Sequence, residues 1–65
     1  MRLAENIKMF REEKGMSQGE LARKVYTSQQ MIGAIEQGIR RPSLDLAIAL
    51  AGIFETTVEV LVGRE

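Results

Sequence analysis

Apolar residues recur along this chain at spacings of three and four, which is the pattern of helices that each bury one face. In the first stretch, Leu3, Ile7 and Phe10 share one face, and Gly15 then supplies the left-handed residue that commonly ends a helix. No stretch alternates apolar and polar residues as a half-buried strand does. The pattern therefore predicts an all-α domain.

The chain also carries signals for helix starts at short intervals. Ser17 and Glu20 form a capping-box pattern, in which each side chain bonds the backbone amide of the other residue. Similar signals near residues 27–28, 42–43 and 56–57 open three more helices, because serine and threonine are favoured N-caps and proline disfavours helix at the residue before it. Together the signals predict five short helices joined by loops of a few residues.

Chain size and composition exclude several classes of protein. The 65 residues form one domain, residues 1–65, and include no cysteine or histidine, which excludes disulfides, the common zinc sites and Ser–His–Asp catalysis. Carboxylates such as Glu12 and Glu13 are neighbours on a helix rather than facing a common point, which argues against an enzyme. The apolar stretch from Leu46 to Phe54 is too short for a membrane span, and the N-terminus lacks a signal-peptide pattern. We expect a cytoplasmic protein without metal or cofactor.

The formal net charge of zero conceals an uneven distribution of charge along the chain. Residues 17–43 carry four arginine or lysine residues against two glutamates, whereas residues 44–65 carry one arginine against four acidic residues. The middle of the chain is therefore basic and its tail is acidic. By itself this distribution is a weak indication of nucleic-acid binding.

Residues 17–37 carry the strongest functional signal. They predict two short helices joined by a tight turn, which is the general form of a helix-turn-helix. On a helical wheel, Ile32 and Ile35 lie on one side of the second helix, and the opposite side carries only amides and small residues: Gln29, Gln30, Gly33, Ala34 and Gln37. Such a face suits close approach to DNA, because glutamine can pair bidentately with adenine in the major groove. A capping role with Thr27 is an alternative for Gln30.

Several motifs cover almost the whole chain in a fixed order. They are Arg11, Ser17-Gln18-x-x-Leu21-Ala22, Thr27-Ser28-Gln29-Gln30, Ile32-x-x-Ile35-Glu36-x-Gly38 and Pro42-Ser43. In this order and spacing the chain closely resembles the phage-repressor/Cro-type (Xre-like) helix-turn-helix family. The resemblance implies a compact five-helix, lambda-repressor-like fold, with the helix-turn-helix at about residues 17–37 and double-stranded DNA as the partner.

The resemblance also implies a role for individual residues. Gln18 matches a glutamine that bonds a phosphate and braces the start of the recognition helix, and Ser28 matches the cap of that helix. Arg40 and Arg41 match a loop that contacts phosphates. The residues expected to contact DNA are therefore Gln18, Ser28, Gln29, Gln30, Gly33, Ala34, Gln37, Arg40 and Arg41.

Two further matches concern the fold of the family. Arg11 and Glu36 match a charge pair that ties the first helix to the third. Tyr26 departs from the family, because it occupies a turn position that often holds glycine. A positive φ at that position would strain a tyrosine by roughly 1 kcal/mol.

The small size of the chain favours association with a second copy, since a domain of this length has a thin core. Ile39, Ile48 and Val60 are apolar residues that fall outside the predicted inner faces. We expect a homodimer through the last helix, with Val58, Val60 and Leu61 at the interface.

The sequence therefore favours a sequence-specific transcriptional regulator, a dimeric repressor that reads a pseudo-palindromic operator in the major groove. The alternative is an antitoxin or adaptor that uses the same fold mainly to hold a partner protein. The acidic tail and the near-neutral charge keep this alternative open.

Overall fold

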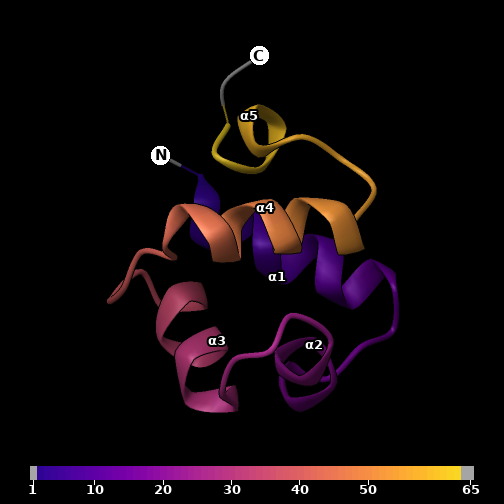
Figure 1. Cartoon of the computed structure of the whole chain (residues 1–65), viewed down its shortest axis with the longest axis vertical. Coiled ribbons are helices and arrows are strands. Elements are labelled where there is room, and N and C mark those ends of the chain that lie inside the picture. The colour runs from indigo at the N-terminus through magenta and orange to yellow at the C-terminus, as the bar shows by residue number, and fades with distance from the viewer. Residues whose placement is uncertain (1, 64–65) are drawn as a thin grey trace.

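The computed structural model describes residues 2–63, and within them five helices pack around one core (Figure 1). The helices are α1 (Leu3–Glu13), α2 (Gln18–Lys24), α3 (Gln29–Glu36), α4 (Leu44–Ile53) and α5 (Val58–Leu61). No strand occurs in the described residues. The predicted all-α, five-helix fold is confirmed.

Hydroxyl caps begin four of the helices, at the positions that the sequence indicated. The side-chain oxygens of Ser17, Ser28, Ser43 and Thr57 each accept a hydrogen bond from the backbone amide three residues further on. At Ser17 the capping box is complete, because the Glu20 carboxylate also accepts from the Ser17 backbone amide at 2.9 Å. These caps satisfy amides that the first helical turn leaves without a partner.

Left-handed residues allow the chain to reverse direction after four of the helices. Gly15, as the sequence predicted, and Gly38 follow α1 and α3 with φ of 69° and 78°. Tyr26 after α2 and Glu55 after α4 do the same with φ of 61° and 57°. Glycine adopts this conformation readily, whereas a residue with a side chain is strained in it.

The core draws on every helix. Its largest fully buried side chains are Ile7, Leu21, Ile32, Ile35, Leu50 and Leu61. The rings of Phe10 and Phe54 stack at its edge with centroids 5.4 Å apart. With so few large side chains, truncation of any one to alanine is expected to cost about 2–5 kcal/mol.

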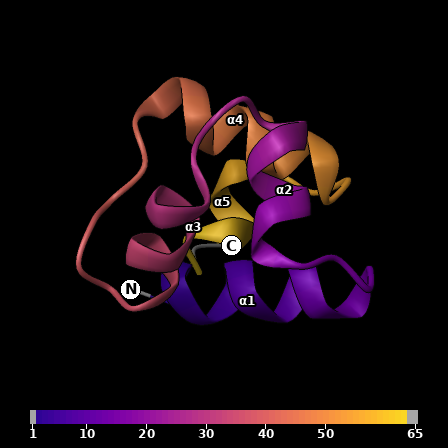
Figure 2. The same cartoon turned by 90° about the horizontal axis from the view of Figure 1, so that it is seen from below.

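The arrangement of the helices leaves one side of the molecule to α2 and α3. In Figure 1, α1 and α4 cross the middle of the molecule, α5 lies on one side of them, and α2 and α3 lie on the other. Figure 2 looks onto the side that carries α2 and α3. Among the described residues, no helix has the length and apolar character needed to cross a membrane.

One expectation about the last helix is wrong. The sequence assigned Leu61 to an exposed interface, but its side chain is 0% exposed and belongs to the core of its own chain. Val58 is half-buried, and only Val60 is exposed, at 41%. The physical reason is that α5 is only four residues long, so most of its apolar side chains are needed to close the core.

Candidate nucleic-acid interface

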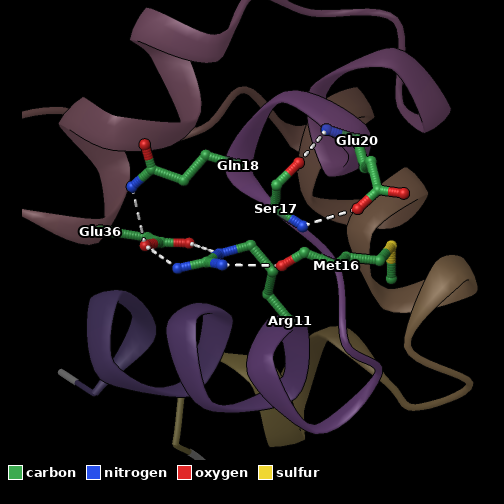
Figure 3. Close-up of polar contacts among 6 residues, drawn as sticks. All are labelled: Arg11, Met16, Ser17, Gln18, Glu20 and Glu36. Carbon is green, nitrogen blue, oxygen red and sulfur yellow. Dashed lines mark hydrogen bonds and ion pairs between the residues drawn. The ribbon is translucent and has the colours of Figure 1, made fainter.

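A polar cluster ties α3 to both α1 and α2 (Figure 3). The Nε and one Nη of Arg11 donate to the two oxygens of Glu36 at 2.7 and 3.0 Å, and the other Nη donates to the carbonyl of Met16 at 2.8 Å. Gln18 adds a third donor to Glu36 at 3.1 Å. The predicted charge pair is thus present, with its side chains only 11% and 4% exposed.

These contacts keep both groups of the pair charged. Burial opposes ionisation of Glu36, but the hydrogen bonds from Arg11 and Gln18, together with the charges of Arg11 and Lys8, lower its pKa below 4.5. The hydrogen bond to Glu36 is the largest influence on Arg11 and raises the pKa of its guanidinium above the ordinary value. The negative charge at the end of α3 is therefore balanced by Arg11 within the fold.

Gln18 differs from its expected role at the recognition helix. Its amide bonds Glu36, the last residue of α3, so it braces the end of the helix rather than the start. Gly33 lies under this amide: a Cβ on Gly33 would stand 3.5 Å from the Gln18 side-chain oxygen. The expectation that Gln18 braces the start of α3 is wrong, because its side chain runs over Gly33 toward Glu36.

The exposed face of α3 and the first residue of α2 meet at one hollow. It has a volume of about 460 Å³ and is lined by Gln18, Gln29, Gln30, Gly33, Ala34 and Gln37. All five residues of the face found on the helical wheel line this hollow, and none of its lining side chains carries a charge. The structure therefore gathers amide donors and acceptors on a surface where DNA bases have room to approach.

The first turn of α3 leaves its glutamines free of the cap. Ser28 caps α3 by accepting from Met31 at 3.1 Å, which agrees with its predicted role. Gln30 forms no capping box with Thr27, because the N-cap is Ser28. The Gln29 side-chain oxygen would lie 3.4 Å from a Cβ on Gly19, so this amide lies across the start of α2.

The basic loop between α3 and α4 borders a second hollow. Arg40 and Arg41 are exposed, and they line a hollow of about 590 Å³ together with residues of the α2–α3 turn and the start of α4. Asp45 is the acidic residue among the lining side chains. The two predicted phosphate-contacting arginines thus lie apart from the glutamines, beside a different part of the surface.

Tyr26 lies at the same second hollow, although no sequence pattern indicated a binding role for it. Its side chain is 96% exposed, and its φ of 61° is the positive value for which the sequence predicted strain. The signal that pointed to this residue was its departure from the glycine that the family often has there.

Among the described residues, no group of three acidic side chains is placed to hold a metal ion.

Comparison with known proteins decides the family. A family model described as helix-turn-helix matches residues 7–61. The chain belongs to this helix-turn-helix family. Two relatives from Archaeoglobus fulgidus, each named an uncharacterized HTH-type transcriptional regulator, are 42% identical over 55 residues and 40% identical over 53 residues. These matches cover 85% and 82% of this chain, and 79% and 75% of the relatives.

Solved structures of SinR share the fold of this helix-turn-helix protein. The N-terminal DNA-binding domain of SinR from Bacillus subtilis has a TM-score of 0.89 at 26% identity, covering 98% of this chain and 94% of that one. SinR in complex with DNA has a TM-score of 0.85 at 28% identity, covering 92% and 97%. In a complex of SinR with SinI the TM-score is 0.87 at 27% identity, and the match covers 94% of this chain but 60% of that one. The family and its relatives identify a DNA-binding regulator and not an enzyme.

Proposed function

We propose that this helix-turn-helix protein is a sequence-specific transcriptional repressor that binds a pseudo-palindromic operator as a homodimer in the cytoplasm. In this proposal α3 enters the major groove and its glutamines read the bases. The observation that carries the proposal is the uncharged hollow formed by Gln18 and the exposed face of α3. Solvent-exposed helix faces ordinarily carry charged residues, so a face made of amides and small residues suits contact with base edges.

Positioning on the duplex is assigned to groups outside this hollow. The basic residues Arg40 and Arg41 would neutralise phosphates on one flank of the groove. Ser28 uses its oxygen as the helix cap and retains its hydroxyl proton for a phosphate. The charge pair of Arg11 and Glu36 holds α3 against α1, so the reading face meets DNA as a preformed surface.

The dimer belongs to the same proposal. Val60 is an exposed apolar residue on α5, on the side of the molecule opposite α2 and α3. A two-fold axis through two copies of α5 would present two recognition helices, which read half-sites about 34 Å apart. Val58 and Val60 remain the proposed interface residues, without Leu61.

Selection of binding sites from random duplex DNA tests this proposal directly. We expect the purified protein to enrich one sequence with two related half-sites in inverse orientation. Enrichment of a single half-site would reject the dimeric operator, and no enrichment at low salt would reject sequence-specific binding altogether. Salt must be held fixed, because phosphate contacts make every affinity depend on it.

A second function is favoured by one of the structural comparisons. SinR, whose fold this chain shares, has been solved in complex with the protein SinI. Binding of a partner protein by an antitoxin or adaptor would leave the α3 face unused or covered. Stable co-purification with one protein, combined with the absence of an enriched DNA sequence, would support this second function over the first.

A further inference from the structure

Tyr26 combines two features that do not contribute to folding. Its ring is 96% exposed, so it adds nothing to the core, and its φ of 61° lies in the left-handed region. A bulky residue in this region is an outlier, and such residues concentrate at functional sites. The backbone of the turn does not require a tyrosine, because glycine or asparagine adopts this conformation more easily.

The surroundings of Tyr26 indicate what its side chain contacts. It lines the hollow of about 590 Å³ that Arg40 and Arg41 border from the α3–α4 loop. Ser43, Asp45 and Leu46, at the start of α4, line another side of this hollow. Two arginines against the single carboxylate of Asp45 make the hollow suited to an anionic occupant.

The geometry also relates this hollow to the reading face. Tyr26 is three residues before Gln29, the first residue of α3, and Gln29 lines the hollow of glutamines. A duplex with its bases against the glutamines therefore has a backbone strand close to the turn. Tyrosine suits such a strand, because its ring covers sugar carbons while its hydroxyl donates a hydrogen bond.

We propose that Tyr26 is a DNA-backbone contact, with its ring along the sugars and its hydroxyl bonded to a phosphate oxygen beside those held by Arg40 and Arg41. This contact rests on the DNA-binding function proposed above and adds to it a residue at the turn between α2 and α3. It also accounts for a tyrosine where the fold would accept a smaller residue, since the strain is then offset by binding.

Three variants test the contact on the duplex obtained by site selection. Tyr26→Asn removes the ring and suits the left-handed backbone, and Tyr26→Phe removes only the hydroxyl. Glu55→Asn is the matched control, because Glu55 has φ of 57°, is exposed and lies at the far end of α4 from the basic loop. The ten residues of α4 separate the two ends by about 15 Å.

We expect both Tyr26 variants to bind about tenfold more weakly, because each loses a hydrogen bond to a charged group. The dependence of affinity on salt should keep its slope, since a neutral hydroxyl displaces no counterion. Glu55→Asn should bind like the wild type, and the two asparagine variants should melt at or above the wild-type temperature, because both relieve the same backbone strain.

The proposal is overturned if Tyr26→Asn binds the duplex like the wild type, or if Tyr26→Phe does. It is also overturned if Tyr26→Asn changes the sedimentation mass of the free protein while half-site affinity stays the same, which would assign Tyr26 to a protein interface. These results differ from failure of the proposed function, in which the wild type itself selects no duplex.

Discussion

Arg11 and Glu36 lie 25 positions apart in the sequence, yet two hydrogen bonds of 2.7 and 3.0 Å join their side chains across α1 and α3. Because Glu36 is the last residue of α3, the pair sets the position of this helix relative to α1. Gln18 reaches the same carboxylate from α2, so three helices meet at one group. The end of α3 is thus held in place by contacts with both α1 and α2.

The first prediction is that Arg11 and Glu36 act as a unit. Arg11→Met or Glu36→Leu alone should lower the free energy of unfolding by about 3 kcal/mol, because each leaves a partly buried partner without its counter-charge. The double variant should lose less than the sum, since no charge is then left unpaired. Urea unfolding of the four proteins measures the coupling. Additive losses would show that the two side chains act independently.

The second prediction concerns acid stability. The pKa of Glu36 lies below 4.5 in the folded protein, so its stabilising contribution is complete above pH 4.5 and is lost as the pH falls through the lowered pKa. Glu36→Gln should therefore show a flatter decline of unfolding free energy below pH 4.5. Glu13→Gln is the control, because Glu13 is exposed and its carboxylate contacts no donor among the described residues. An unchanged decline in Glu36→Gln would contradict this assignment.

The third prediction concerns the reading of bases. Gln29→Ala and Gln30→Ala should each cost about 1–3 kcal/mol on the selected duplex and relax the preference at one or two base pairs. Thermal stability should hardly change, since both side chains are exposed. Binding to specific and random duplexes in one buffer measures the effect. If both variants keep every base preference of the wild type, α3 is not the reader.

The fourth prediction separates phosphate contacts from base contacts. Arg40→Ala and Arg41→Ala should weaken binding equally on all duplexes and lower the slope of affinity against salt by about one. Lys8→Ala is the control, because Lys8 shares its surface hollow with Glu5, Glu12 and Glu13 and so is poorly placed for a phosphate. Slopes equal to that of the wild type in both arginine variants would remove the loop from the interface.

The fifth prediction concerns the dimer. Val60→Glu should convert the protein to a monomer and weaken operator binding, because a charge at an apolar interface is left without a partner. Ile48→Glu is the control on α4, where an apolar side chain is 54% exposed. Sedimentation equilibrium at tens of micromolar measures the mass of each. A wild-type monomer, with and without operator, would reject the dimer, and loss of the dimer only in Ile48→Glu would move the interface to α4.

The sequence alone determined the helices and the exposed face of α3 that carries the glutamines. Capping residues such as Ser17 and Ser28 act on amides three residues away, so their effect is local and can be deduced from residue order. The exposed face of α3 was equally predictable, because helical periodicity separates Ile32 and Ile35 from the glutamines. The charge pair of Arg11 and Glu36 required the family resemblance, since nothing local connects residues 25 positions apart.

Only the tertiary structure decided which apolar side chains are buried in the core and which polar side chains are bonded within the chain. The sequence predicted Leu61 at an interface, but its side chain is buried in the core. Which side chains the core buries depends on how all five helices pack. The Gln18 side chain bonds Glu36 because Gly33, which has no side chain, leaves space for it across α3. Tyr26 shares a hollow with Arg40 and Arg41 because the loops before and after α3 border the same part of the surface, which residue order does not show. Local patterns determine the helices and their faces. The burial of each side chain, its bonding partners and the contacts between loops depend instead on how the helices pack.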